Sequence, residues 1–580
     1  MPTEAGMWNL AWAEWLIEEL VRQGVGAFFI SPGSRSAPLT AAAARNPRAR
    51  TFVHFDERGA GFAAVGFAKA AGRPAALIGT SGTAAANYFP AIVEASQSHT
   101  PLLIITADRP PELIDAGVNQ TIDQTRLYGA YPRWRADMPC PSPDVPAEYV
   151  LTTAAQAVYR ATRPPAGPVH LNCRFREPLL PDTPLSTPAS LETWASQGLP
   201  YTHYPAAPQH PSDAALDALQ SAIAPARRGL LIVGALNSRP ERDAVREVAR
   251  ALNWPTFADS TSGLRLGNPQ PPFVPQYPLL LAGDFLSRAP KPDVVVHIGG
   301  PITAKRLQTY LRDAHPPIHV RVAAHPNRVD PDHGITLRVE AGIEHACQAM
   351  GRMPIASPDM DWAASIFTAA AQIERCVDEC FAQDHSLSEP AVARLLSRHL
   401  AADAALFLGN SMPIRDMDTF ASPHGAEVPV FANRGASGID GNVCTAAGIA
   451  LGLDCPVTAV MGDLALLHDI NGLALLKQTP VVLVVLNNDG GGIFHFLPVA
   501  KHADIFEPFF VAPHGLRFEH AARMFGIEYA APTDATQFAQ AYAHAIQKRV
   551  GAIIEVQTIA AENLRTHTAL EGSVRRAGKE

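Results

Sequence analysis

Short apolar runs alternate with longer, alanine- and leucine-rich stretches along most of the chain. The apolar runs have the length of buried strands, and the stretches between them have the length of helices. Strands that alternate with helices predict parallel sheets with helices on both faces. We therefore expect an α/β fold made of doubly wound parallel sheets. The predicted strands lie at residues 26–30, 75–79, 101–108, 229–234, 294–300, 406–410, 456–463 and 481–488.

Two stretches interrupt this alternation and indicate domain boundaries. Residues 181–215 are rich in proline and serine, and residues 351–361 form a shorter break of the same kind. The chain has 580 residues, which is too long for a single hydrophobic core. We therefore predict three domains, at residues 1–185, 186–355 and 356–580.

The first and third predicted domains repeat the same order of elements. In each, an Arg-Gly-Ala sequence, at 58–60 and at 434–436, opens a helix rich in alanine and glycine. A strand and a second helix follow, and Thr-Pro then precedes the next strand, at 100–101 and at 479–480. Such similar spacing predicts duplicated doubly wound domains.

The predicted strand at 481–488 ends in an unusual group of polar residues and glycines. Asn487, Asn488 and Asp489 are followed by three consecutive glycines, and Asp463 ends the preceding strand. The carboxyl ends of such strands lie at the edge where open α/β sheets bind ligands. A carboxylate, an amide and main-chain carbonyls at one edge offer the oxygen ligands that Mg²⁺ prefers. Taken singly, Asp463 would be a helix cap and the Asn-Gly run a turn.

Composition and charge argue against several classes of function. The net charge of -8 disfavours general nucleic-acid binding, and no GxGxxG or GxxxxGK[ST] motif stands between a predicted strand and a helix. The seven cysteines include no CxxC pair, so neither a disulfide framework nor a zinc ribbon is indicated. No apolar run approaches the about 18 residues of a membrane span, and Glu14, Glu18 and Glu19 interrupt the N-terminal segment where a signal peptide would be uncharged. We expect a cytoplasmic protein with no membrane span and no nucleic-acid partner.

The Gly-Asp and Asn-Asn pairs at 462–463 and 487–488 together resemble the metal-binding motif of the thiamine diphosphate-dependent enzymes. The resemblance implies the thiamine diphosphate-binding fold, with pyrimidine-binding, central and diphosphate-binding domains in that order. It also implies thiamine diphosphate as cofactor and Mg²⁺ or Mn²⁺ as its metal. By resemblance, the metal ligands are Asp463, Asn488 and the carbonyl of Gly490. The further cofactor contacts implied are Gly435, Ser437, Gly438, Ile439, Gly462, Leu464, Gly491 and Ile493, the first four in a glycine-containing loop before a helix.

Glu57, in the sequence HFDERGAG, is the candidate catalytic residue. Members of this family use a carboxylic acid to hydrogen-bond the aminopyrimidine of the cofactor. The resemblance implies that this glutamate faces the diphosphate bound by another chain, so we expect a homodimer or homotetramer with active sites at the subunit interface. A desolvated glutamate would have a raised pKa suited to proton relay. A favourable interaction with the helix dipole is the alternative role for Glu57.

Several motifs narrow the resemblance to the menaquinone-pathway branch of this family. They are SPGSRSAPLT (31–40), TSGTAAANYFPAIVEA (80–95), TADRPPEL (106–113), GPITAKRLQ (300–308), GNSMPIRDMD (409–418), NRGASGIDG (433–441) and NNDGGGIFHFLP (487–498). The resemblance implies decarboxylation of 2-oxoglutarate and 1,4-addition of the resulting succinyl carbanion to isochorismate.

Both implied substrates carry carboxylates, for which an acidic chain must supply local cations. The cations within the matching motifs are Arg35, Arg109, Lys305, Arg306, Arg415 and Arg434. Their implied hydrogen-bonding partners are Ser34, Gln120 and Ser411, and the apolar walls are Ile439, Ile493, Phe494 and Leu497. For each cation, a solvated surface position is the alternative.

Two other interpretations remain open. The first is another thiamine diphosphate-dependent carboligase or decarboxylase of 2-oxo acids, which SPGSRS together with NRGASGIDG disfavours. The second is a non-catalytic relative that keeps the fold, which the presence of Glu57, Asp463 and Asn488 disfavours.

Overall fold

The computed structural model describes residues 2–181, 185–283, 285–382 and 386–577. The chain divides into two compact units. Unit 1 comprises Met1–Ala206, Asn433–Cys455 and His468–Thr479, and unit 2 comprises Ala207–Ala432, Pro456–Leu467 and Pro480–Glu580. Unit 1 therefore includes two short segments from the C-terminal part of the sequence.

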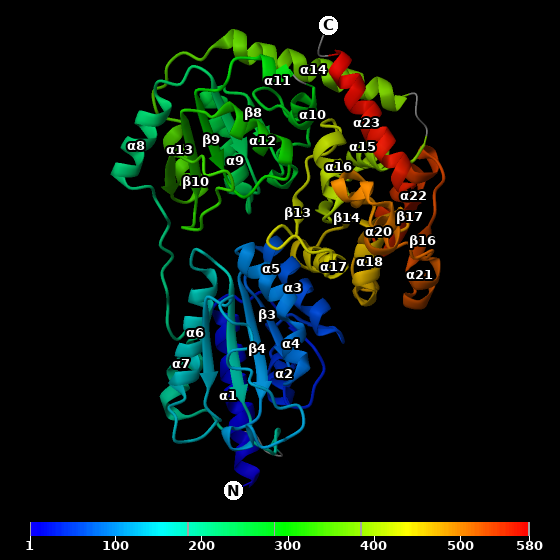
Figure 1. Ribbon diagram of the computed structural model, residues 1–580. Helices are drawn as coiled ribbons and strands as arrows, with labels where there is room; N and C mark the ends of the chain where they lie inside the picture. The colour runs from blue at the N-terminus through cyan, green and yellow to red at the C-terminus, as the bar shows by residue number, and fades with distance from the viewer. Residues whose placement is uncertain (1, 182–184, 284, 383–385, 578–580) are drawn as a thin grey trace. The chain divides into compact units, whose positions relative to one another are not determined.

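Unit 1 contains a six-stranded, all-parallel sheet with helices along both faces (Figure 1). The strands β4 and β6 are buried along their whole length, as expected for central strands covered on both sides. The strand order is β2-β1-β3-β4-β6-β5. The strands are β1 Ala27–Ile30, β2 Thr51–Val53, β3 Ala75–Gly79, β4 Leu102–Asp108, β5 Trp134–Met138 and β6 Pro168–Arg174.

The helices of unit 1 include one very close helix pair, α3 and α17. A Cβ at Gly66 of α3 would lie 2.1 Å from the Thr445 carbonyl oxygen, and one at Gly448 of α17 would lie 2.0 Å from the Ala63 carbonyl oxygen. The alanine- and glycine-rich sequence therefore lets the two helix backbones touch. The helices are α1 Pro2–Arg22, α2 Ala37–Arg45, α3 Glu57–Ala71, α4 Thr83–Asn87, α5 Phe89–Gln97, α6 Glu148–Thr162, α7 Glu192–Gln197, α17 Asn442–Leu453 and α19 Leu473–Leu476.

Unit 2 contains a second six-stranded parallel sheet whose order, β13-β12-β14-β15-β17-β16, matches that of unit 1 strand for strand. This identity of topology confirms the repeat predicted from sequence spacing. The strands are β12 Ala405–Leu408, β13 Val430–Ala432, β14 Val457–Gly462, β15 Val481–Asn487, β16 Glu528–Ala530 and β17 Ala552–Gln557.

Unit 2 also contains a five-stranded parallel sheet of order β11-β10-β9-β7-β8. Its strands are β7 Gly229–Val233, β8 Thr256–Ala258, β9 Val294–Ile298, β10 Ile318–Ala323 and β11 Leu337–Glu340. A continuous apolar core joins residues of this sheet, such as Phe257, to residues of the larger sheet, such as Val484. Three parallel α/β sheets confirm the predicted fold class.

The remaining helices cover the two sheets of unit 2, and α18 runs from unit 2 residues into unit 1 at His468. None of the helices among the described residues is long and apolar enough to cross a membrane. The helices are α8 Asp213–Ile223, α9 Arg239–Leu252, α10 Tyr277–Ala282, α11 Phe285–Arg288, α12 Lys305–Ala314, α13 Ile343–Met350, α14 Met360–Ala382, α15 Glu389–His399, α16 Met412–Phe420, α18 Asp463–His468, α20 Ala503–Phe506, α21 Glu519–Phe525, α22 Ala535–Lys548 and α23 Ala560–Ala577.

Candidate active site

The predicted metal ligands of unit 2 follow two neighbouring strands at one edge of the sheet. β14 and β15 pair in parallel with Gly462 opposite Leu486. Asp463 comes directly after β14, and Asn488 comes directly after β15. The two side chains therefore start from adjacent positions at the carboxyl edge, where open α/β sheets bind ligands.

Asp463 is held by main-chain N–H groups on both of its oxygens. Leu464 N–H donates to Oδ1 at 2.7 Å and Gly490 N–H donates to Oδ2 at 2.9 Å. Burial raises the pKa of the Asp463 carboxyl, and these N–H donors together with His514 act in the opposite direction. His514 Nε2 lies 3.2 Å from Oδ2. The N–H donors and the histidine ring fix the direction in which the carboxylate faces.

The amide of Asn488 is bonded on one side only. Its Nδ2 donates to Oε1 of Glu389 at 2.8 Å. Its Oδ1 is buried and has no hydrogen-bond partner among the described residues. Glu389 is itself buried, and this burial raises its pKa to about 7, with the nearby Asp416 carboxyl acting in the same direction. A buried acceptor without a donor is costly unless a ligand meets it.

The glycines after Asn488 are required by the backbone path. Gly490 has φ +131°, and a Cβ there would lie 2.1 Å from the carbonyl oxygen of Val511. A Cβ at Gly492 would lie 2.4 Å from Nδ2 of Asn488. Side chains at either position would displace the segment that surrounds the amide.

This donor set fits a hard divalent cation. It combines a fixed carboxylate and an unpartnered amide oxygen, which are oxygen ligands of the kind Mg²⁺ prefers. The carbonyl of Gly490 lies in the same turn and accepts a hydrogen bond from Gly492 N–H at 2.9 Å. The described residues contain no cluster of three or more His, Cys, Asp or Glu side chains arranged for a metal ion. A carboxylate-amide-carbonyl site is not a cluster of that type.

Two residues at this edge were not found by sequence reasoning. Glu389 begins α15 directly after the helix cap Ser388, so its position suggests only a favourable helix start. His514 lies in a loop 51 residues beyond Asp463, and no motif connects the two. Only the folded chain brings Glu389 and His514 to the ends of β14 and β15.

The other predicted residues of unit 2 have varied environments. Arg306 forms an ion pair with Glu571 at 2.6 Å, and Lys305 before it is exposed at the start of α12. Arg415 of α16 is exposed and donates to the carbonyl of Ser411. The rings of Phe494 and Phe510 lie 5.5 Å apart, edge to face. Gly491 is buried, Leu464 and Ile493 are half-buried, and Leu497 is 45% exposed.

In unit 1, Glu57 is the first residue of α3. Asp56 caps this helix by accepting hydrogen bonds from the N–H groups of Arg58 and Gly59. The Glu57 side chain is half-buried, and its Oε2 accepts a hydrogen bond from Asn87 Nδ2 at 3.4 Å. Asp56, and not Glu57, is therefore the residue that caps the N–H groups of this helix.

Two of the predicted arginines of unit 1 form a buried cationic pair. Arg35 donates to the carbonyl of Phe175 and to Glu177. Arg109 donates to Ser81, while its Nε is buried without a hydrogen-bond partner in the described part of the chain. Burial, and after it the positive charge of Arg35, lowers the pKa of Arg109. The unused Nε donor of the buried Arg109 suits an anionic ligand.

The remaining predicted residues of unit 1 lie in loops. Ser34 and Gln120 are exposed, and Gln120 has a positive φ of 56°. The loop from Arg434 to Gly441 begins against Glu94 of α5, which accepts hydrogen bonds from Gly435 N–H and Ala436 N–H. Within it, Ser437 is exposed, and Gly438 and Ile439 are half-buried. The loop leads directly into α17, as predicted for a loop before a helix.

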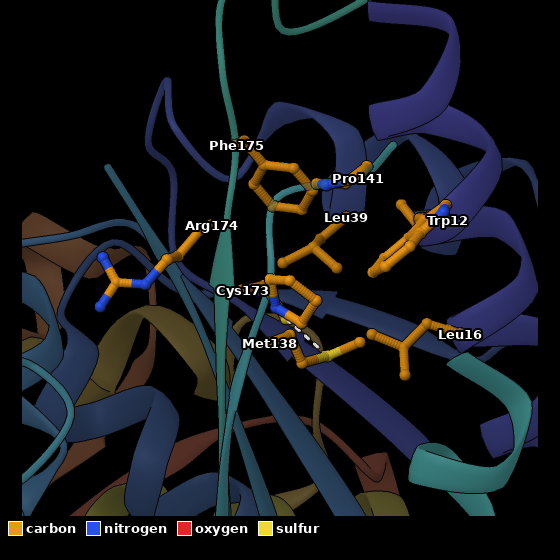
Figure 2. A pocket seen from close by; sticks show the side chains of 10 residues that line it. Trp12, Leu16, Leu39, Met138, Pro141, Cys173, Arg174 and Phe175 are labelled. Atoms are coloured by element: carbon orange, nitrogen blue, oxygen red, sulfur yellow. Dashed lines mark hydrogen bonds between the residues drawn. The ribbon is translucent and has the colours of Figure 1, made fainter. Parts of the chain in front are cut away.

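An apolar cavity in unit 1 does not belong to this site. Its volume is about 10 Å³, roughly the space of one water-sized sphere. Figure 2 shows its apolar side chains facing one another while the guanidinium of Arg174 points away; that group is paired with Asp137 at 3.0 Å. The labelled apolar side chains are Trp12, Leu16, Leu39, Met138, Pro141, Cys173 and Phe175.

Comparison with known proteins agrees with this geometry. Residues 11–127 match the N-terminal TPP binding domain of thiamine pyrophosphate enzymes, residues 186–408 match their middle domain, and residues 429–556 match their C-terminal TPP binding domain. A solved structure from Mycobacterium smegmatis, described as a thiamin diphosphate-dependent enzyme, superimposes with a TM-score of 0.69 at 22% identity. It covers 93% of this chain and 98% of its own, and it supports the fold alone.

Two curated relatives are similar over nearly the whole chain, and both are named 2-succinyl-5-enolpyruvyl-6-hydroxy-3-cyclohexene-1-carboxylate synthase. The protein of Rubrobacter xylanophilus is 50% identical over 562 residues, covering 97% of this chain and 98% of the relative. That of Salinibacter ruber is 47% identical over 574 residues, covering 98% and 97%. This chain therefore belongs to the thiamine pyrophosphate enzymes, and within them to the 2-succinyl-5-enolpyruvyl-6-hydroxy-3-cyclohexene-1-carboxylate synthase family.

Proposed function

We propose that this protein decarboxylates 2-oxoglutarate and adds the resulting succinyl carbanion to isochorismate, giving 2-succinyl-5-enolpyruvyl-6-hydroxy-3-cyclohexene-1-carboxylate. The observation that carries the proposal is the 47–50% identity to synthases of that name over nearly full length. The carboxylate-amide-glycine arrangement after β14 and β15 supports it from the chemistry of the site.

In this proposal, unit 2 holds the divalent metal and the diphosphate. Asp463 and Asn488 bind Mg²⁺ or Mn²⁺ through side-chain oxygens, and Gly490 binds it through its carbonyl. Gly462, Leu464, Gly491 and Ile493 are the proposed cofactor contacts around them. In unit 1, the proposed contacts are Gly435, Ser437, Gly438 and Ile439.

Glu57 is proposed as the catalytic residue. Thiamine diphosphate, when bound, supplies a nucleophilic carbon and accepts the electron pair that loss of carbon dioxide leaves behind. The Glu57 carboxyl would hydrogen-bond the aminopyrimidine ring and hold or release a proton there. A carboxylate that is half-buried and bonded to a single amide can do this without first breaking a strong ion pair.

The substrate carboxylates are proposed to bind to arginine and lysine side chains. The Arg35–Arg109 pair is the best supported, because it is buried and Arg109 retains an unused donor. Each charge-assisted hydrogen bond contributes about 1.5–3 kcal/mol. The other proposed substrate contacts are Ser34, Gln120, Lys305, Arg306, Ser411, Arg415, Arg434, Ile493, Phe494 and Leu497.

We also propose a cytoplasmic homodimer or homotetramer in which each active site combines two chains. In this assembly, the proposed Glu57 site of one chain would meet the proposed metal site of another; the two sites follow strands of different sheets of the repeat. The division into domains at 1–185, 186–355 and 356–580 stays a prediction.

The test is incubation of the purified protein with thiamine diphosphate, Mg²⁺, 2-oxoglutarate and isochorismate, with carbon dioxide release and isochorismate consumption followed together. We expect coupled turnover that stops when either cofactor is omitted. Carbon dioxide release without isochorismate consumption would overturn the assigned acceptor. Absence of both reactions in folded protein that binds the cofactor would overturn the assigned substrates.

A further inference from the structure

The side chain of Glu389, at the start of α15, is hydrogen-bonded to Asn488, which follows β15. Its carboxylate is buried, with 1% of the residue exposed. Its Oε1 accepts hydrogen bonds from Asn488 Nδ2 at 2.8 Å and from Thr558 Oγ1 at 3.1 Å. Thr558 follows β17, which pairs with β15 along its length. Three separate elements therefore meet at one carboxylate oxygen.

The hydrogen bond to Glu389 selects the orientation of the Asn488 amide. An asparagine amide presents two N–H donors on one side and an acceptor oxygen on the other. Oε1 of Glu389 accepts from the Nδ2 side of the amide, so the Oδ1 side faces away from Glu389. That Oδ1 is buried without a partner among the described residues. A rotated amide would place N–H groups where the proposed cation binds.

We propose that Glu389 is a positioning residue for the divalent metal: its carboxylate holds the amide of Asn488 so that Oδ1 faces the ion. The inference rests on the proposed metal site of Asp463, Asn488 and Gly490. Gly492 assists, because a Cβ there would lie 2.4 Å from Nδ2 and would push the amide out of place. Partners that orient metal ligands typically change metal affinity about 10–100-fold when mutated.

Glu555 offers a matched control on the same sheet. It is fully buried on β17 and accepts a hydrogen bond from Nδ2 of Asn487 at 2.7 Å. The pair Glu555–Asn487 thus repeats the pair Glu389–Asn488 one residue earlier, with an amide that is not a proposed metal ligand. Replacing either glutamate removes a buried carboxylate. Only the replacement of Glu389 also removes the group that orients an amide at the proposed metal site.

The experiment measures the Kd of Mg²⁺ by titration calorimetry with thiamine diphosphate in fixed excess. The proteins are the wild type, Glu389→Gln, Glu389→Ala and Glu555→Gln, each first shown to be folded by its thermal melt without cofactor. We expect at least a tenfold weaker Kd for Glu389→Ala, a smaller loss for Glu389→Gln, which keeps one acceptor oxygen, and a Kd within twofold of wild type for Glu555→Gln. Raised Mg²⁺ should restore turnover of the Glu389 variants, so the concentration of Mg²⁺ that gives half-maximal rate changes more than kcat.

A second background separates orientation from simple attraction between Glu389 and the cation. In Asn488→Asp, the side chain has no N–H group to be oriented, and it faces Glu389 with a second carboxyl. There, the amide introduced by Glu389→Gln would donate a hydrogen bond to that second carboxyl, so its weakening of Mg²⁺ binding should vanish or reverse. A carboxylate that acts only through its charge would weaken binding equally in both backgrounds when it is replaced.

The outcomes distinguish this inference from the proposed metal site. No Mg²⁺ binding by the wild type would remove the metal site itself. Wild-type binding with a Kd within twofold for both Glu389 variants, equal weakening by Glu555→Gln, or equal weakening in the Asn488→Asp background would each overturn the role of Glu389. If Glu389→Ala does not fold, Glu389→Gln in the two backgrounds decides the question.

Discussion

Within the turn at 487–492, neighbouring residues have different roles in the structure. The side chains of Asn487 and Asn488 donate hydrogen bonds to Glu555 and Glu389, respectively. The Asp489 carboxylate accepts hydrogen bonds from the N–H groups of His514 and Gly515. The glycines that follow allow the chain to pass close to Val511. The polar residues therefore have different partners even though they are adjacent in the sequence.

Gly490 provides a test at this scale. Gly490→Ala would place a Cβ 2.1 Å from the Val511 carbonyl oxygen at a φ of +131°, so we expect a loss of stability of about 1–3 kcal/mol and weaker Mg²⁺ binding. Gly462→Ala is the matched control for stability, because a Cβ there would meet no atom within 4 Å. Urea unfolding of both variants checks the expectation. Equal stability of the two would show that the turn at Gly490 tolerates a side chain.

At the scale of elements, α5 and α3 hold the loop that precedes α17. Glu94 of α5 bonds the N–H groups of Gly435 and Ala436 and forms an ion pair with Lys69 of α3 at 2.8 Å. The Lys69 and Glu94 side chains are 13% and 3% exposed. The ion pair is therefore shielded from water, and it ties the proposed cofactor loop to two helices.

Breaking this ion pair should destabilise unit 1 and loosen the loop. Glu94→Gln leaves the shielded charge of Lys69 without its carboxylate, which typically costs about 3–5 kcal/mol, and we expect a higher Kd for thiamine diphosphate. The double variant with Lys69→Met should be less destabilised than the sum of the two single variants, because the remaining charge is gone. Urea unfolding and cofactor titration measure both effects. Additive losses would show that the two side chains act independently.

Asp469 links α17 to the segment after α18 through a buried carboxyl. Its Oδ2 accepts Cys444 N–H at 2.9 Å, and the other charged groups acting on it are Arg58 and Asp56. Burial raises the pKa of Asp469 to about 7. The folded state thus keeps the proton at a pH where the unfolded chain has already lost it.

The stability contribution of Asp469 should therefore decrease as pH rises from its ordinary pKa to about 7 and stay constant above that. Asp469→Asn removes this dependence. The unfolding free energy of the variant relative to that of the wild type should therefore rise by up to about 3 kcal/mol between pH 5 and pH 7. Unfolding free energies at pH 5, 6, 7 and 8 measure the difference, with Asp454→Asn, at the exposed C-terminal end of α17, as control. A constant difference between Asp469→Asn and wild type across this range would contradict the assignment.

At the scale of the whole molecule, the proposed catalytic and metal-binding residues are divided between the two sheets of the repeat. Glu57 follows β2 of the first six-stranded sheet, and Asp463 and Asn488 follow β14 and β15 of the second. If each active site combines two chains, a variant lacking one part can be complemented by a variant lacking the other.

Subunit complementation tests this assembly. Glu57→Gln and Asp463→Asn should each be inactive alone, whereas proteins dissociated together and reassembled should recover about one quarter of wild-type activity, because half of randomly paired dimers are mixed and each has one intact site. The molecular mass of the reassembled protein, measured without cofactor, checks that dimers have re-formed. Mixed dimers without activity would mean that Glu57 and the metal ligands act within one chain.

Periodicity and motif spacing were sufficient for the parallel sheets, for the repeat and for the positions of Asp463, Asn488 and the glycines. Those features depend on local pattern: apolar runs form buried strands, and a chain that leaves a strand toward a ligand needs polar atoms and glycine within a few residues. Glu389, His514, Glu94 and Asp469 were not found in this way. Each acts on a residue 25 to 341 positions away along the chain, and a lone carboxylate or imidazole has no pattern of its own. Only the tertiary structure decides which buried polar groups meet, because desolvation makes each of them depend on whichever partner the fold places beside it.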